Sequence, residues 1–187
     1  MSPDPGTVTQ LLNAAGHGDA AARDRLWAVL YNELTQMAQR QLARESPAAA
    51  RQATSLVHDL FIRLTAGQQV DFENRRHFFG SAARAMRQIL VEDARKRTAE
   101  KRGGGKRPQE LHDVPANPPH DPAELLAVDE ALKKLEKIDP RRAEIVTLRY
   151  FAGLTGDEIA ALLDLASRTI DAEWQSTRAW LHRELFP

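Results

Sequence analysis

The sequence has no cysteine, which excludes disulfide bonds and thiolate metal sites. It has no apolar run long enough to cross a bilayer, and its first ten residues lack the basic and apolar regions of a signal peptide. These absences predict a cytoplasmic protein with no membrane partner. β-Branched runs are also missing, whereas Ala, Leu, Arg and Glu are abundant, and this composition predicts an all-α fold.

The sequence also lacks the motifs of common catalytic sites. It contains no phosphate-binding loop, nucleophile elbow or paired-carboxylate pattern. The six histidines are scattered, and no HExxH-type spacing occurs. We therefore expect no enzymatic activity, no cofactor and no metal site.

A net charge of zero conceals an uneven distribution of charge. Residues 1–102 carry a balance of +4, residues 103–122 one of −1, and residues 123–187 one of −3. Within residues 74–107, eleven Lys and Arg accompany only three acidic residues. A basic helix with aromatic residues at its start suits a nucleic-acid backbone and unstacked bases, so the first part of the chain is predicted to bind a polyanion.

Glycine and proline are concentrated in one stretch. Three Gly and five Pro lie within residues 103–122, too many for a stable helix or a packed core. We interpret this stretch as a flexible linker between two helical domains, 1–102 and 123–187.

The apolar periodicity of the first domain predicts four helices. The first covers residues 8–15, and Asp19 caps a second helix that ends before Pro47. The third begins near residues 54–55 and ends at Gly67. The fourth is the basic helix.

The basic helix has distinct inward and outward faces. Its apolar residues, expected to face inward, are Phe79, Ala82, Ala83, Met86 and Leu90. The outward face is formed by Arg84, Gln88 and Arg95. Arg87 flanks that face. Because adjacent residues on a helix point about a hundred degrees apart, we expect Phe79 in the core and Phe78 nearer the surface. For Phe78, a place in the core is nevertheless favoured over a role in base contact.

The second domain is also predicted to be helical. Helices over 125–135 and 139–150 precede a third over 155–163, which starts with the capping-box pattern TGDE. A short turn, 164–166, leads to a final helix that begins at Ser167. Two helices joined by a tight turn, the second with a polar face, are typical of a helix-turn-helix.

These blocks together resemble the extracytoplasmic-function (ECF) class of bacterial RNA polymerase sigma factors. The matching segments, in the family's order and spacing, are 16–31, 56–64, 77–97, 139–163 and 167–181. The resemblance implies a sigma region two that binds the clamp helices of core RNA polymerase and melts the minus-ten promoter element. It also implies a sigma region four, which holds the polymerase flap and reads the minus-thirty-five element.

The resemblance also implies roles for individual residues. Core-polymerase binding falls on Leu56, Asp59, Leu60, Phe61 and Arg63. Contacts in the minus-ten region fall on Asn74, Arg75, Arg76, His77, Phe78, Arg84, Arg87, Gln88, Arg95, Lys96 and Arg97, and the loop over 72–77 is placed where the family captures an extruded base. The recognition helix offers Ser167, Arg168, Thr169, Gln175 and Arg178. For Leu56, Leu60 and Phe61 a place in the internal core is an equal alternative.

The recognition helix departs from the family pattern. Asp171 and Glu173 are expected on its outer face, where the family usually has neutral or basic residues, and Asp164 replaces a common turn glycine. Phosphate repulsion should then weaken minus-thirty-five binding. Alternatively, an acid accepts a hydrogen bond from a cytosine amino group, or the acids face the polymerase or solvent.

The hypothesis is therefore a sigma factor with core RNA polymerase and promoter DNA as partners, and an anti-sigma factor as a possible third. The two domains are expected to stay apart on the linker until they dock on separate polymerase surfaces. Two alternatives remain open at this point. One is a non-sigma helix-turn-helix regulator that binds duplex DNA as a dimer, and the other is an interaction module that has lost minus-thirty-five readout.

Overall fold

The computed structural model describes residues 5–17, 19–42, 47–65, 72–102 and 122–185. These residues form eight α-helices and no strand, which confirms the all-α expectation. None of the described helices is both long enough and apolar enough to span a bilayer. The expected linker lies outside the described residues except for Pro122, which begins a helix.

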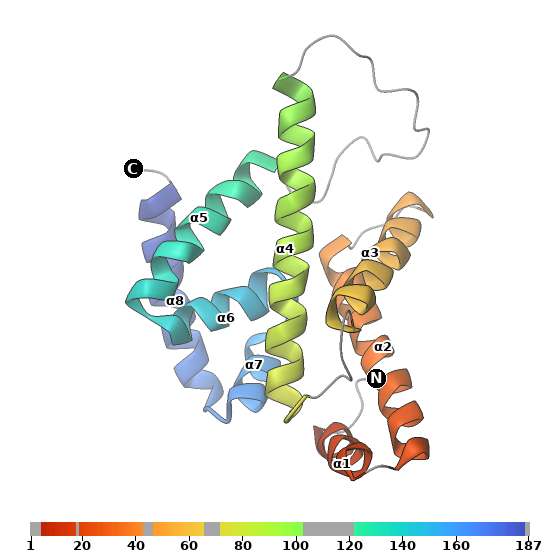
Figure 1. Ribbon diagram of the computed structural model, residues 1–187. Coiled ribbons are helices and arrows are strands. Elements are labelled where there is room, and N and C mark those ends of the chain that lie inside the picture. The colour runs from red at the N-terminus through yellow and green to blue at the C-terminus, as the bar shows by residue number, and fades with distance from the viewer. Residues whose placement is uncertain (1–4, 18, 43–46, 66–71, 103–121, 186–187) are drawn as a thin grey trace.

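The first four helices form one group, here called the N-terminal helices. They are α1 (Pro5–Gly16), α2 (Ala20–Leu42), α3 (Pro47–Thr65) and α4 (Arg75–Arg102). The long α4 stands at the centre of the molecule, and α2 and α3 lie along one side of it (Figure 1).

Local sequence signals explain where the N-terminal helices begin. The Asp19 carboxylate accepts a hydrogen bond from the Ala22 N–H at 3.1 Å, so the predicted cap of α2 is confirmed. The expected start of α3 near residues 54–55 is wrong, because that helix begins at Pro47. Proline fits the first position of a helix, and the alanines that follow it favour helix strongly.

The last four helices form a second group, the C-terminal helices. They are α5 (Pro122–Ile138), α6 (Pro140–Tyr150), α7 (Gly156–Leu163) and α8 (Ser167–Leu185). The last two, α7 and α8, form the helix-turn-helix pair. Their starts agree closely with the sequence prediction: α7 follows its Thr155 cap, and α8 begins at Ser167.

Two caps and one turn fix the helix-turn-helix. The predicted capping box is present: the Thr155 side chain accepts from the Glu158 N–H, and the Glu158 carboxylate accepts from the Thr155 N–H at 2.8 Å. At the end of α7, Asp164 has φ 54° and ψ 49°, the left-handed conformation that glycine usually provides. Asp tolerates that conformation better than most residues, so this departure from the family pattern preserves the turn.

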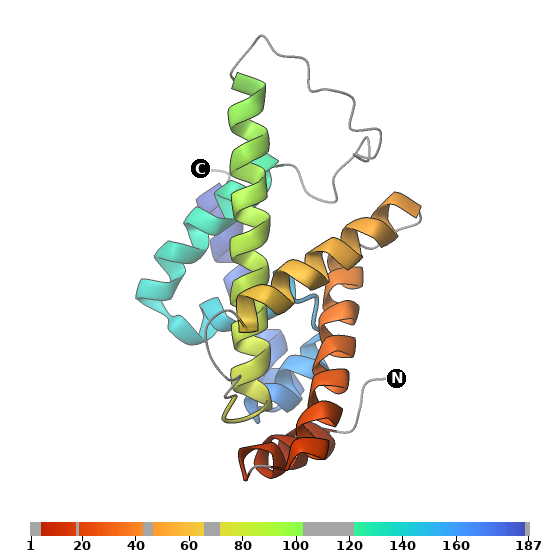
Figure 2. The same cartoon turned by 45° about the vertical axis from the view of Figure 1, so that its right-hand side comes forward.

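The two groups of helices pack against each other. Helices α5 and α6 lie against α4 on the side opposite α2 and α3 (Figures 1 and 2). The buried hydrophobic residues of both groups belong to one continuous cluster. The expectation that the two parts stay separate therefore does not describe this structure. The sequence argument missed their attraction because the opposing charges lie far apart along the chain.

The turn after α6 lies against α2. Gly153 in this turn has φ +66°, a conformation that side chains with a Cβ rarely adopt. A Cβ added there would lie 2.8 Å from the Arg40 Cβ on α2. The absence of a side chain thus allows both the turn and the close approach of the two groups.

Replacing Gly153 with alanine should destabilise the protein by about 2 kcal/mol or more, through backbone strain and the clash with Arg40. Urea unfolding measures this loss. Gly80→Ala is the matched control, since a Cβ at Gly80 meets only the Arg84 side chain, at 3.7 Å. Because Gly80 lies in the interior of α4, where glycine is unfavourable, Gly80→Ala should raise the free energy of unfolding by roughly 0.5–1 kcal/mol. Equal effects of the two substitutions would contradict the role given to Gly153.

Candidate nucleic-acid and polymerase interfaces

The basic helix α4 has an apolar face in the core and a polar face outside. Phe79, Ala82, Ala83 and Met86 are buried as expected, and Leu90 is partly buried. Arg84, Gln88, Arg95 and Lys96 are exposed, and Arg97 is partly exposed. Arg97 forms an ion pair with Asp93 one turn earlier, at 2.6 Å.

Arg87 differs from the other predicted DNA contacts because it faces the C-terminal helices. It is 9% exposed. Its Nε lies 2.7 Å from Asp129 Oδ1, its Nη2 donates to the Asp129 carbonyl at 3.1 Å, and its Nη1 donates to Glu136. Its guanidinium carbon is 6.0 Å from the centre of the Phe151 ring. The prediction that Arg87 flanks an open basic face is therefore corrected: in this conformation α5 covers it.

The Arg87–Asp129 contact is ionic. Burial raises the pKa of Asp129, but hydrogen bonds from Lys133 and Arg87 and their charges outweigh it, so the pKa lies below its ordinary value. Asp129 therefore stays ionised at neutral pH. Arg95 lies at the edge of the same site, with Nη2 3.8 Å from Asp129 Oδ2.

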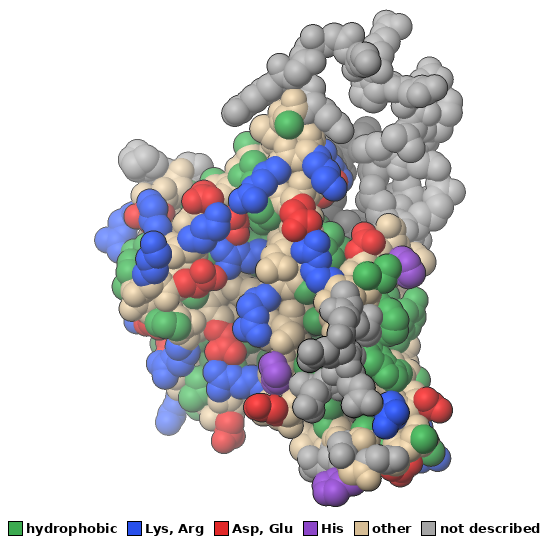
Figure 3. Space-filling model, viewed as in Figure 1, with side chains coloured by type: hydrophobic (Ala, Val, Ile, Leu, Met, Phe, Trp, Pro, Cys, Tyr) green, Lys and Arg blue, Asp and Glu red, His purple; other side chains and the backbone are tan. Residues whose placement is uncertain are grey.

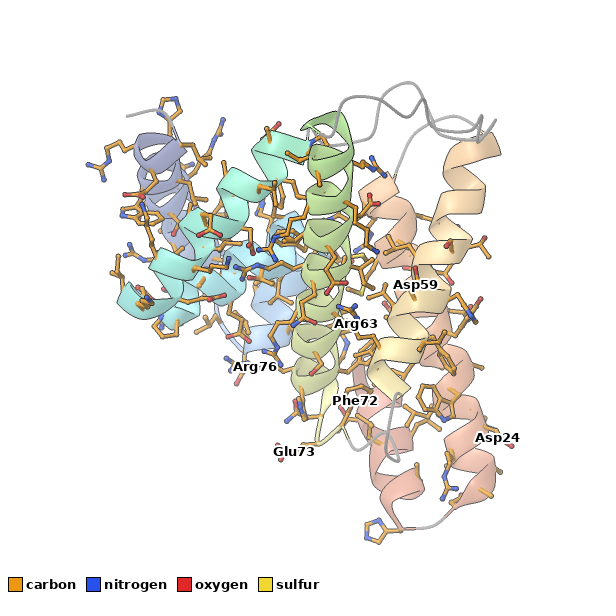
Figure 4. All side chains as sticks on the ribbon, turned by 45° about the horizontal axis from the view of Figure 1, so that its top comes forward. Asp24, Asp59, Arg63, Phe72, Glu73 and Arg76 are labelled. Atoms are coloured by element: carbon orange, nitrogen blue, oxygen red, sulfur yellow. The ribbon has the colours of Figure 1, made fainter. Side chains whose placement is uncertain are left out.

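Two further ion pairs join the N-terminal and C-terminal helices. Arg76 donates to both carboxylate oxygens of Glu144 on α6, at 3.2 and 2.7 Å. Figure 4 shows Arg76 pointing from the lower end of α4 toward the C-terminal helices. Arg40 on α2 binds both oxygens of Glu158 on α7, at 3.2 and 2.8 Å. In each case the base belongs to the N-terminal helices and the acid to the C-terminal helices.

These pairs give the charge asymmetry of the sequence an internal explanation. The positive balance of residues 1–102 was interpreted as a sign of a polyanion partner. Part of that charge is matched within the protein by Asp129, Glu136, Glu144 and Glu158. On the face of the molecule seen in Figure 3, basic and acidic side chains are interspersed.

The start of α4 combines exposed polar groups with a buried aromatic cluster. The Asn74 side chain accepts from the His77 N–H at 2.9 Å and caps the helix. Asn74 and His77 are exposed, whereas Arg75 is partly buried, with its guanidinium 4.9 Å from the Phe79 ring centre. Residues 66–71 of the preceding loop lie outside the described residues.

Phe78 is in the core, as the favoured interpretation of the sequence had it, and it does not lie nearer the surface than Phe79. It is 1% exposed, like Phe79. The chain before α4 folds back so that the Phe72 ring lies edge-on to the Phe78 ring, with centroids 5.1 Å apart. Helical geometry allowed Phe78 to face outward, but it could not reveal that Phe72 would cover it. Phe78 is therefore unavailable for direct contact with a base in this conformation.

The predicted polymerase contacts on α3 separate into core and surface residues. Leu56 and Leu60 are buried, at 6% and 0% exposed, so they belong to the internal core. Asp59 and Arg63 are exposed and Phe61 is half-buried. Arg63 points toward α4 (Figure 4) and pairs with Glu92 at 2.9 Å while also donating to Gln88 at 3.3 Å.

An aromatic surface on α2 and α3 was missed in the sequence. The Phe61 ring centre lies 5.2 Å from that of Trp27 and 6.4 Å from that of Tyr31. Tyr31 and Ile62 are 45% and 48% exposed. Hydrophobic side chains gather on this side of the molecule in Figure 3. The four-residue spacing of Trp27 and Tyr31 was the available signal, because it places both on one helix face.

The recognition helix α8 presents most of its predicted residues to solvent. Ser167, Arg168, Gln175 and Arg178 are exposed, and Thr169 is partly buried. Asp171 is also exposed. Glu173, however, is 9% exposed and pairs with Arg141 of α6, so its predicted place on the outer face is wrong. An ion pair between the buried Glu173 and the exposed Arg141 side chain explains this acid without reference to DNA.

A match to a protein-family model covers both groups of helices. The family model described as ECF sigma factor matches residues 5–187. Neither a curated protein nor a solved structure matches the chain. The family match includes the basic helix, the aromatic surface and the helix-turn-helix in one continuous alignment. The chain belongs to the family of ECF sigma factors.

Proposed function

We propose that this protein binds core RNA polymerase, directs it to specific promoters and promotes the opening of promoter DNA. Members of its family are transcription initiation factors and not enzymes, so the polymerase supplies the chemistry. The observation that carries the proposal is the combination, on a chain of this family, of a basic helix with exposed Arg and Lys and a helix-turn-helix with an open polar face.

We assign core-polymerase binding to the surface around Phe61. Asp59 and Arg63 lie on the same helix, and Tyr31 and Ile62 extend the surface with exposed apolar groups. An aromatic centre with charged residues at its edge is typical of a protein–protein interface. The clamp helices of the polymerase are the partner that the family suggests.

We assign promoter contacts in the minus-ten region to two parts of α4. Arg84 and Lys96 are exposed and can bind phosphates, which releases counterions from the DNA. Asn74, Arg75 and His77 lie at the start of the helix and offer polar groups to an extruded base. Holding separated strands and accepting an unstacked base are the two functions that opening requires.

We assign minus-thirty-five readout to Ser167, Arg168, Gln175 and Arg178 on α8. Amide and basic groups at the start and outer face of a recognition helix suit base edges and phosphates. Asp171 is the acid on this exposed face. Because Glu173 is buried, Asp171 is the one of these two acids that can repel the DNA phosphates.

The direct test of this function is binding to purified core RNA polymerase, followed by transcription on fragments of the source genome. We expect stoichiometric binding and new, discrete start sites. Binding without start sites would instead support an interaction module. Retention of duplex DNA in the absence of the polymerase, with no binding to the core enzyme, would support an ordinary helix-turn-helix regulator and overturn the proposal.

The basic face of α4 can be tested by combining Arg84→Ala with Lys96→Ala. Because two phosphate contacts are lost, promoter opening should fall, and the slope of log affinity against log salt should become shallower by about 2. Arg23→Ala with Arg25→Ala on α2 makes the same charge change elsewhere and should leave opening unaltered. An equal loss of core-polymerase binding would show that this surface has been assigned wrongly.

The two acids of α8 should respond differently to neutralisation. Asp171→Asn should strengthen binding to minus-thirty-five DNA, because it removes an exposed charge that repels phosphate. Glu173→Gln should lower stability by at most about 1 kcal/mol, because it removes the charge from a pair whose Arg141 side chain is 57% exposed and so screened by water. Filter binding and urea unfolding separate these effects. Weaker DNA binding by Asp171→Asn would indicate that this acid reads a base.

A further inference from the structure

We propose that Arg63 determines a base preference in the minus-ten region, because it fixes the side-chain amide of Gln88 with the NH2 group directed toward DNA. Gln88 then donates a hydrogen bond to an acceptor on a promoter base and discriminates against bases that present an amino group. The inference rests on the proposed function and adds a base preference to it. It makes Arg63 a positioning residue for DNA, whereas the resemblance to the family assigns Arg63 to polymerase binding.

A network of three side chains carries this inference. Arg63 on α3 donates from Nη1 to Gln88 Oε1 on α4, at 3.3 Å. The same guanidinium binds both carboxylate oxygens of Glu92, at 3.2 and 2.9 Å. Glu92 lies four residues after Gln88, so both side chains lie on one face of α4. Figure 4 shows Arg63 pointing from α3 toward that helix.

Glu92 holds the Arg63 guanidinium in one orientation. The hydrogen bonds from Arg63 lower the pKa of Glu92 below its ordinary value, so this carboxylate is ionised at neutral pH. Two parallel hydrogen bonds also fix the plane of the guanidinium, which a single bond would not do. The Arg63 and Glu92 side chains are 36% and 51% exposed, so the pair contributes orientation more than stability.

The orientation of the amide decides what Gln88 can bind. A glutamine amide carries an acceptor oxygen and a donor NH2 group, and a freely rotating amide can present either one. Because an arginine only donates, the atom of Gln88 that faces Arg63 must be the oxygen. The NH2 group therefore points away from the guanidinium. Gln88 is exposed and lies one turn after the exposed Arg84, on the face of α4 to which we assign promoter contacts.

A donor at this position fits some bases better than others. Thymine and guanine present keto oxygens in the major groove, whereas cytosine presents an amino group. Adenine presents an acceptor and an amino group, and the usual pair of glutamine with adenine needs the amide oxygen as well as the NH2 group. Because Arg63 binds that oxygen, we expect thymine or guanine to be preferred over adenine and cytosine. A phosphate oxygen is the other acceptor that DNA offers, but it carries no sequence information.

Four variants of the full chain separate these roles. Arg63→Met removes the donor that holds the amide, so Gln88 can rotate and accept from an amino group. Gln88→Glu still accepts from Arg63 but presents a second oxygen in place of the NH2 group. Gln88→Ala has no amide to orient. Arg25→Met removes an exposed arginine from α2 and is the matched control for the loss of charge.

The first measurement is transcription from a pool of promoters randomised over the minus-ten region, with core RNA polymerase saturated by each variant. The unmodified protein and Arg25→Met should prefer thymine or guanine at one position by roughly fivefold. Arg63→Met should reduce this preference to less than about twofold, and Gln88→Glu should reverse it toward adenine or cytosine. In the Gln88→Ala background, Arg63→Met should have no further effect, because Arg63 acts through Gln88.

The second measurement needs neither polymerase nor DNA. In protein labelled with ¹⁵N, the side-chain NH2 signal of Gln88 reports how freely the amide moves. The amide should be ordered in the unmodified protein, and its order parameter should fall below about 0.6 in Arg63→Met. A mobile amide in the unmodified protein would overturn the proposal.

Two results of the transcription assay would also overturn the proposal. One is an unaltered base preference in Arg63→Met, and a loss of core-polymerase binding in the same variant would then return Arg63 to the polymerase-binding surface. The other is a uniform loss of transcription across the pool in Gln88→Ala, which would make the acceptor a phosphate. An ordered Gln88 amide in a protein that initiates no transcription would instead contradict the proposed function.

Discussion

The arrangement of this protein depends on the ion pair between Arg87 of α4 and Asp129 of α5. It is the most buried charge contact between the N-terminal and C-terminal helices. Two charges are removed from water there, and the desolvation is offset only because hydrogen bonds satisfy both partners. Arg87 uses all three nitrogens, and Asp129 also receives Lys133. Such a contact defines one alignment of α4 and α5 and excludes most others.

The same pair connects structure to function. Arg87, which holds α4 against α5, is a residue that the resemblance to the family assigns to DNA binding. A basic helix is useful for promoter opening only if its arginines are available when DNA arrives. It is a liability in the free protein, since exposed positive charge binds any polyanion without specificity. Acids of the same chain cover part of that helix at Arg87, whereas most of the polar residues of the recognition helix are exposed.

Much of the fold could be predicted from the sequence, because local signals determine it. Asp19 and Thr155 mark helix starts by hydrogen bonds to residues three positions away. The contact between Arg87 and Asp129 joins residues 42 positions apart, and no periodicity connects them. The core place of Phe78 depends on Phe72 across a turn, and the buried state of Glu173 depends on Arg141 of another helix. Contacts between residues far apart in the sequence, or across a turn, determine the positions of Arg87, Phe78 and Glu173. The sequence therefore identified these residues as notable but did not reveal their partners.

The central claim is that the two groups of helices pack together in the free protein, and small-angle X-ray scattering of the unmodified chain tests it most directly. One compact body of this length has a radius of gyration of roughly 16 Å. The account predicts a value near this at low salt, with an increase at high salt as the ion pairs between α4 and α5–α7 are screened. A clearly larger radius at low salt, unchanged by salt, would mean that the two groups of helices are already apart and would contradict the account.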